Sequence, residues 1–449
     1  MTNGTSQTAP ALLSRRQQQQ QQQQQAMVVM SMYVGYASFM VLRMIPTVAG
    51  TSITSDPEFG VSTEDWGRIL AMGTVGAVVG KFIGGLAADR LGGRLTFFAG
   101  LIVSSLGVAA FAASKTVAAF QLTFFVALMA KSVGWPSMTK IIELSFRPNE
   151  YGRVWGLLAT SSRVGTLVAT FVLGGLLGRM TWQEMSYLAA AAGVVIAVGF
   201  FFTQPGGKSN AVKLEDKEAD DDNPWEETPS IDTQHPLRNS TLPEAIGYFC
   251  SSRQFWLITF SMMGLTIMWD FLMMVPLYLV QTMGMSPAGA SQTASAFPLG
   301  SLISVLAGGY LFDRLSRGAT AWLMGFLLAV AAGCVLTFYF MPGMNLPESE
   351  LVKLSLGLLF VFGMCVSPCY YIPMSVFSIE FGGRHSGFLI ALLDALAFGV
   401  TAVFYFYAGT IAERSWGLFL LVLFGVCVWA MITTLLFMLG EAKRALAAA

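Results

Sequence analysis

The sequence has little charge and almost no histidine. Only 12% of the 449 residues are Asp, Glu, Lys or Arg, which is about half the share found in soluble domains. Basic and acidic residues balance at 26 each, so nothing indicates a nucleic-acid partner. The two histidines, His235 and His385, both lie in polar connections between apolar stretches. A histidine-based proton relay inside the apolar stretches is therefore not expected.

Cysteine is also scarce, and the motifs of common catalytic sites are missing. The cysteines lie mostly inside apolar stretches, where we interpret them as small packing residues: Cys250, Cys334, Cys365, Cys369 and Cys427. No zinc-binding spacing, nucleophile elbow or phosphate-binding glycine loop occurs. We therefore expect no enzyme, no metal and no cofactor.

Apolar residues are abundant and come in long blocks. They make up 54% of the chain, and the mean hydropathy is +0.61, so the expected solvent is a lipid bilayer. The blocks predict membrane-spanning helices at residues 27–50, 65–88, 95–113, 117–146, 153–178, 185–203, 254–283, 288–312, 319–341, 351–379, 386–412 and 415–439. We predict an all-α polytopic membrane protein with twelve transmembrane helices in two six-helix bundles, residues 26–203 and 254–440.

Polar segments flank and separate these two bundles. Residues 1–25 contain no acidic residue and end in a run of glutamines, which favours a disordered tail, with an organelle transit peptide as the alternative. Residues 204–253 hold an acidic run and several prolines and predict a solvated cytoplasmic linker. A short amphipathic helix is expected within Thr241–Ser252, lying on the membrane surface. Residues 441–449 are predicted to be a cytoplasmic tail.

Basic residues in the short connections indicate the orientation in the membrane. Connections on one side carry Arg90, Arg94, Arg147, Arg153, Arg314, Arg317 and Arg384, and the other side carries Arg68, Lys115, Arg179, Lys353 and Arg414. The richer side is expected to face the cytoplasm, and it is the side of both termini. The sequence does not distinguish a plasma or inner membrane from an organelle envelope.

A glycine-rich turn occurs twice, half a chain apart. Gly84–Arg94 reads GGLAADRLGGR, and Gly308–Gly318 reads GGYLFDRLSRG. Two such turns between apolar blocks predict an internally duplicated transporter. We expect charge pairs in these turns to close one conformation and release another. The predicted gating residues are Gly85, Asp89, Arg90, Arg94, Gly309, Asp313, Arg314 and Arg317.

Charged residues inside predicted spans are costly and therefore mark candidate functional sites. The cations Arg43, Lys81, Lys140 and Arg163 lie in the first bundle, and the acids Asp270 and Asp394 lie in the second. This division suits a site between the bundles, where cations hold an anionic ligand. The acids are expected to be ion-pair partners of those cations, proton carriers or contacts for an ammonium group. Lys81 is equally expected in a gating or packing pair.

The predicted substrate-binding residues are Arg43, Arg163, Lys140, Tyr36, Trp269 and Tyr371. An arginine deep in a span can hold phosphate or carboxylate with two hydrogen bonds. Alternatively, Arg43 lies near a helix end and its side chain extends to the membrane surface. Tyrosine hydroxyls orient polar ligands in apolar pockets.

The two turns resemble the signature of the major facilitator superfamily. Four stretches are more specifically similar to the organophosphate:phosphate antiporters, which include bacterial glycerol-phosphate and hexose-phosphate transporters and animal glucose-6-phosphate transporters. These stretches are VLRMIP (41–46), GKFIGGLAADR (80–90), KSVGWPSMTKIIELSF (131–146) and NEYGRVWG (149–156).

That resemblance implies roles for single residues. Arg43 matches the arginine that holds phosphate, and Lys81 and Lys140 match the basic residues of spans two and four. The sequence departs from the pattern at Met268, where the family has its second phosphate-holding arginine, and at Ser162, where it has a histidine. Arg163 stands at the neighbouring asparagine position, so we expect it to serve as the second cation.

Together these features predict a secondary active transporter that moves a small organic anion, such as an organophosphate, by alternating access. Exchange against phosphate is the expected coupling. The alternatives are a proton-coupled symporter of a carboxylate or zwitterion that uses Asp270 and Asp394, and a non-transporting receptor or scaffold with the same fold. The expected partners are a small anionic metabolite, phosphate or protons, and the lipid bilayer, with the protein acting as a monomer.

Overall fold

The computed structural model describes residues 15–147, 150–204, 237, 240–312, 314–344 and 346–448. The helices of the first half are α1 (Arg15–Ser55), α2 (Thr63–Leu91), α3 (Gly93–Ala112), α4 (Val117–Lys131), α5 (Gly134–Ser145), α6 (Tyr151–Leu167), η2 (Val168–Leu173), α7 (Gly174–Leu176) and α8 (Trp182–Thr203). Those of the second half are α9 (Leu242–Ser251), α10 (Arg253–Asp270), η3 (Phe271–Met273), α11 (Val275–Met283), α12 (Pro287–Ala294), α13 (Ala296–Phe312), α14 (Arg317–Phe340), η4 (Met341–Met344), α15 (Glu348–Gly382), η5 (Gly383–His385), α16 (Ser386–Arg414) and α17 (Trp416–Ala448).

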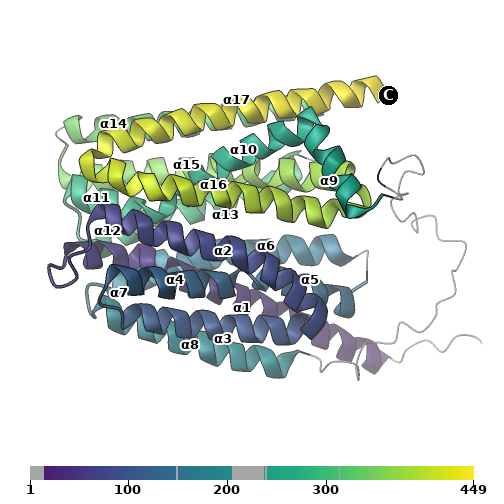
Figure 1. Cartoon of the computed structure of the whole chain (residues 1–449), viewed down its shortest axis with the longest axis horizontal. Coiled ribbons are helices and arrows are strands. Elements are labelled where there is room, and N and C mark those ends of the chain that lie inside the picture. Colours follow the sequence, from purple (N-terminus) through teal and green to yellow (C-terminus); the bar gives the residue numbers. More distant parts are fainter. Residues whose placement is uncertain are drawn as a thin grey trace, which may run out of the picture.

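The long helices form two bundles that lie side by side (Figure 1). Helices α1–α8 build one bundle and helices α10–α17 the other, which confirms the predicted fold class. Within the described residues, eleven helices are long and apolar enough to cross a membrane. The remaining predicted span, 288–312, is divided at Ser295 into α12 and α13. We call the end of the molecule that carries α9 the linker end and the opposite end the loop end.

Proline stands at the break in each of two other predicted spans. The span predicted at 254–283 consists of α10, η3 and α11, and Pro276 stands in the first turn of α11. The span predicted at 117–146 is divided into α4 and α5, and Pro136 stands in the first turn of α5. Because proline has no N–H group, it fits the first turn of a new helix better than a helix interior.

The polar segments are partly described. Helix α1 begins at Arg15, so the prediction of a disordered tail over residues 1–25 is wrong for residues 15–25, because glutamine is a good helix former and extends α1. Residues 1–14 lie outside the described part of the chain, as do residues 205–236 of the predicted linker. The short helix expected within Thr241–Ser252 is present as α9. Its capping box uses Glu244, whose carboxylate accepts a hydrogen bond from Thr241 N at 2.7 Å. The hydrogen bonds from Thr241 lower the pKa of Glu244.

The two halves are tied together at the loop end by hydrogen bonds. Glu413, at the end of α16, accepts a hydrogen bond from the backbone N–H of Glu64 in the first turn of α2, at 2.6 Å. Ser291 of α12 donates to the carbonyl of Thr170 in η2 at 3.0 Å, and Gln281 of α11 donates to Thr63 Oγ1 at 3.2 Å. This end of the interface is therefore closed.

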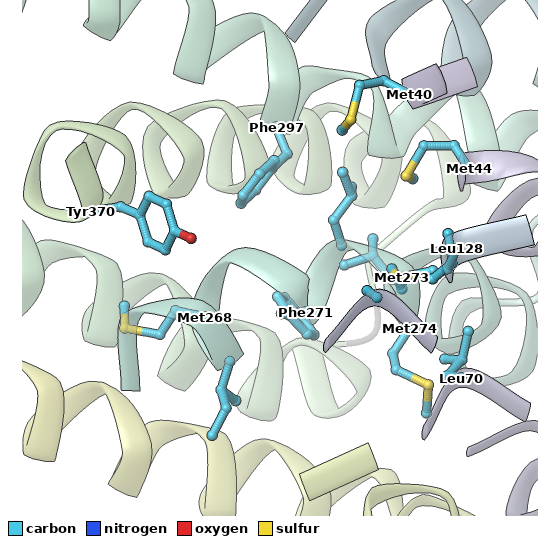
Figure 2. Close-up of a cluster of buried hydrophobic side chains, with 14 of the residues drawn as sticks. Met40, Met44, Leu70, Leu128, Met268, Phe271, Met273, Met274, Phe297 and Tyr370 are labelled. Carbon is cyan, nitrogen blue, oxygen red and sulfur yellow. The ribbon is translucent and has the colours of Figure 1, made fainter. Parts of the chain in front are cut away.

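Methionine fills much of the interface between the halves. Figure 2 shows Met40 and Met44 of α1 facing a cluster that includes Met273, Met274 and Phe297 of the second half. All of these side chains are buried. Because methionine is unbranched and flexible, such a surface can repack when its partner moves.

Candidate functional site

Arg43 and Asp270 form a buried ion pair between the halves. Arg43 lies in α1 and is 8% exposed, and Asp270 ends α10 and is 2% exposed. Arg43 Nη2 lies 2.5 Å from Asp270 Oδ1. Tyr405 of α16 donates to the backbone carbonyl of Asp270 at 2.6 Å. Asp270 Oδ2 is buried and has no hydrogen-bond partner among the described residues.

Arg163 is a buried cation that contacts aromatic rings of the other half. It lies in α6 and is 1% exposed. Its guanidinium lies 4.1 Å from the centre of the Tyr371 ring and 5.3 Å from that of Trp269. Nη1 donates to the carbonyl of Ala159 and to Ser162 Oγ, both at 2.7 Å. Nε and Nη2 are buried without a hydrogen-bond partner among the described residues.

These residues surround a small cavity between the halves. Its volume is about 20 Å³, which is about the space that one water molecule needs. It is lined by Met40, Arg43, Met44, Arg163, Thr166, Trp269, Asp270, Leu272, Met273, Phe297 and Pro298. The predicted residues Arg43, Arg163, Trp269 and Asp270 therefore meet at one place, and Tyr371 contacts Arg163 beside it.

Lys81 and Asp394 form a second ion pair between the halves. Lys81 lies in α2 and Asp394 in α16, and their side chains are 22% and 21% exposed. The Lys81 ammonium also lies 4.4 Å from the centre of the Phe398 ring. Tyr370 donates to Asp394 Oδ1 at 3.5 Å. Each acid predicted in the second half thus pairs with a cation predicted in the first.

Tyr36 lies beside a cation that the sequence analysis missed. The Lys131 ammonium, at the end of α4, is 5.8 Å from the centre of the Tyr36 ring. Tyr36 stands seven residues before Arg43 in α1, so the two side chains lie on one face of that helix. Lys131 falls inside the span predicted at 117–146 and opens the stretch that resembles the antiporters. The rule that selected the other intramembrane cations could have found it.

Lys140 is placed away from this cavity. Its ammonium lies 3.2 Å from Asp89 Oδ1 and 3.2 Å from Glu143 Oε2, and its side chain is 39% exposed. Asp89 stands in the first glycine-rich turn and Lys140 in α5, so this pair joins two helices of the same half. The structure therefore does not bring Lys140 to the other predicted substrate-binding residues.

The first glycine-rich turn is built differently from the expected network of Asp89, Arg90 and Arg94. Arg90 is exposed, and Arg94 donates to the carbonyl of Phe201, with Nη2 at 2.6 Å. Gly92 turns the chain with φ of 82°, a value that favours glycine. Arg94 thus holds the start of α3 against α8 and not against Asp89, which pairs with Lys140.

The remaining predicted gating residues lie around the two turns. A Cβ atom at Gly85 would meet nothing within 4 Å, whereas one at Gly84 would lie 2.8 Å from Val133 Cα, so Gly84 is the glycine that close packing requires. Gly309 lies in α13, Arg317 begins α14, and Arg314 stands between these helices. Asp313 lies outside the described residues.

Comparison with curated proteins finds transporters and a sensor. The chain is 24% identical over 301 residues to a probable hexose phosphate transport protein of Chlamydia muridarum, with 64% of each chain covered. It is 22% identical over 376 residues to the glucose-6-phosphate exchanger SLC37A2 of Mus musculus, covering 76% of this chain and 73% of the relative. It is also 22% identical over 348 residues to the membrane sensor protein UhpC of Escherichia coli, with 75% of each covered. The resemblance to the organophosphate antiporters is confirmed.

Comparison with solved structures finds the same fold. The nucleoside transporter NupG gives a TM-score of 0.69 at 14% identity, covering 92% of this chain and 99% of that one. An inward-facing bacterial homolog of the human lysosomal transporter Spinster gives 0.65 at 14% identity, covering 94% and 96%. The family model of the Major Facilitator Superfamily matches residues 27–397. The chain is therefore an integral, multi-pass membrane protein that belongs to the Major Facilitator Superfamily of transporters.

Proposed function

We propose that this transporter carries a small organic anion, such as a phosphorylated metabolite, in exchange for phosphate. The observation that supports the proposal best is the pair of buried, unsatisfied N–H groups of Arg163 beside the cavity that Arg43 lines. Buried donors nearly always have partners in proteins. An anion with several acceptor oxygens would satisfy them, and arginine can bind such an anion with two parallel hydrogen bonds.

In the proposed mechanism, the anion competes with Asp270 for Arg43. While Asp270 occupies Arg43, the cavity has room for about one water molecule. An entering anion would replace Asp270 as the partner of Arg43 and separate the two side chains. Because this ion pair joins α1 to α10, its separation would loosen the contact between the halves. The same exchange of partners would link anion binding to alternating access.

The names of relatives favour this substrate class. The relatives include a probable hexose phosphate transport protein and a glucose-6-phosphate exchanger. The chain aligns with 64% of the length of the first of these. We also propose that the linker end faces the cytoplasm, as the distribution of basic residues predicts.

Counterflow in liposomes tests the proposed function. Purified full-length protein is reconstituted into liposomes loaded with unlabelled inorganic phosphate, and the uptake of labelled phosphate is measured. We expect saturable exchange that glucose 6-phosphate inhibits. The Arg163→Gln variant should lose most of this exchange. Arg153→Gln is the matched control, because Arg153 also lies in α6 and is exposed.

Two outcomes would contradict this function, and a third would contradict the role of Arg163. Uptake of a carboxylate or zwitterion driven by a proton gradient, without phosphate exchange, would favour the proton-coupled alternative through Asp270 or Asp394. Binding of sugar phosphates without any flux would favour a receptor, and the similarity to the sensor UhpC makes this second candidate worth testing. Equal exchange by Arg163→Gln and wild-type protein would remove Arg163 from the site.

A further inference from the structure

Lys131 is an intramembrane lysine that has no role in the transport function proposed above. Its side chain is partly buried at the end of α4 and lies over the Tyr36 ring. The contact with an aromatic face partly compensates a cation but does not neutralise it. A charged group at this depth is costly unless it serves a site.

The other cations near the interface are mostly neutralised. Arg43 pairs with Asp270, and Lys81 pairs with Asp394. Among the described residues, no carboxylate oxygen lies within the 4.0 Å ion-pair distance of the charged nitrogens of Lys131 or Arg163. These two basic side chains at the interface between the halves therefore lack a carboxylate partner among the described residues, and we call them uncompensated.

Tyr36 places Lys131 beside the helix face that carries Arg43. Its ring lies 5.8 Å from the Lys131 ammonium, and Tyr36 stands seven residues before Arg43 in α1, so both side chains lie on one face of that helix. Lys131 thus lies beside the face of α1 that carries Arg43, although it does not line the cavity.

We propose that Lys131 is a specificity-determining residue that selects doubly charged over singly charged anions. This inference rests on the proposed function. A phosphate monoester carries between about −1.5 and −2 charges at pH 7, which matches the two uncompensated cations. A singly charged ligand would leave one of them without a counter-ion in a poorly solvated place, which is unfavourable.

A pair of probes that differ by one charge tests the proposal. Glycerol 3-phosphate is a monoester, and its methyl ester is a diester with a single negative charge. Both are measured as inhibitors of phosphate counterflow by the wild-type protein and by Lys131→Gln. We expect the wild-type protein to prefer the monoester. Lys131→Gln should weaken monoester inhibition by about ten- to a hundredfold, as expected for the loss of a charged contact, and should leave diester inhibition unchanged within about twofold.

Two further variants separate charge from structure. Lys131→Arg keeps the positive charge and should retain the preference for the monoester. Lys115→Gln removes a lysine whose side chain is 79% exposed and should behave as the wild type. Equal losses for both probes in Lys131→Gln, or no loss for either, would overturn the inference. If the wild-type protein still exchanges phosphate, such a result for Lys131→Gln overturns the role of Lys131 and leaves the proposed function intact. If the wild-type protein neither exchanges phosphate nor binds an anion, the proposed function and the role of Lys131 are both overturned.

Discussion

Gly67 of α2 and Gly409 of α16 pack backbone to backbone across the interface between the halves. A Cβ atom added at Gly67 would lie 2.7 Å from Gly409 N and from Gly409 Cα, which is too close for any real contact. Small residues allow membrane helices to approach this closely. These two glycines lie near the loop end, beside the hydrogen bond between Glu413 and the Glu64 backbone. The close approach therefore belongs to the closed side of the transporter.

A methyl group at this contact should open the loop end. We expect Gly67→Ala to shift the conformational equilibrium toward forms in which α2 and α16 separate there, because rigid backbone atoms cannot move aside. Spin labels at Glu58 and Met344, which are exposed near this end in different halves, should report a longer mean distance. Gly85→Ala is the control, because its Cβ meets nothing within 4 Å. An unchanged distance distribution for Gly67→Ala would contradict the prediction.

Glu413 should hold the same end closed through one hydrogen bond. Its carboxylate accepts from the N–H of Glu64 in the first turn of α2, where the helix has free donors and a partial positive charge. Glu413→Ala removes the acceptor and should lengthen the same spin-label distance. Glu413→Gln keeps a carbonyl acceptor and should lie between Glu413→Ala and the wild type. If the spin-label distance in Glu413→Ala equals that in the wild-type protein, this hydrogen bond does not hold the loop end closed.

The ion pair between Arg43 and Asp270 makes a prediction about stability. Either Arg43→Gln or Asp270→Asn leaves one buried charge without its partner, which costs on the order of 3 kcal/mol in buried pairs. The double variant leaves no charge, so we expect it to recover more than half of the lost thermal stability. Melting temperatures in detergent measure this, and additive losses in the double variant would show that the two side chains do not depend on each other.

The sequence predicted the architecture well because the bilayer restricts it strongly. An uninterrupted apolar block of about twenty residues fits a bilayer as a helix, because a helix satisfies all its backbone groups without water. The repeated turn indicated the two bundles. The breaks within spans were harder to predict. Apolar pattern continues through η3 and through Ser295, and the helix ends there depend on packing between the halves.

The site was predicted in part because an intramembrane charge is conspicuous in any sequence. Arg43, Arg163, Asp270, Lys81 and Asp394 were all selected on that ground. Which cation meets which acid depends on the packing of α1 against α10 and of α2 against α16, and neither contact leaves a local pattern. Lys140 illustrates this point. In the sequence it lies about as far inside its predicted span as Lys81 does, but α5 places it beside Asp89.

Variants of the ion pair between Lys81 and Asp394 distinguish phosphate exchange from proton coupling. If the pair is a latch between the halves, its strength depends on opposite charges and not on which half carries the acid. Asp394→Asn should then slow phosphate counterflow severalfold, and the exchanged variant Lys81→Asp with Asp394→Lys should recover much of the rate. If Asp394 instead carries a proton, the exchanged variant cannot recover, because the carboxylate has moved from α16 to α2 and no longer receives the hydrogen bond of Tyr370 in the same way.

Transport rates measured with and without a proton gradient therefore decide between the ion-pair role and the proton-carrier role of Asp394. Recovery without a gradient supports exchange with an ion-pair latch, and failure of the exchanged variant together with a gradient-dependent wild type supports proton coupling.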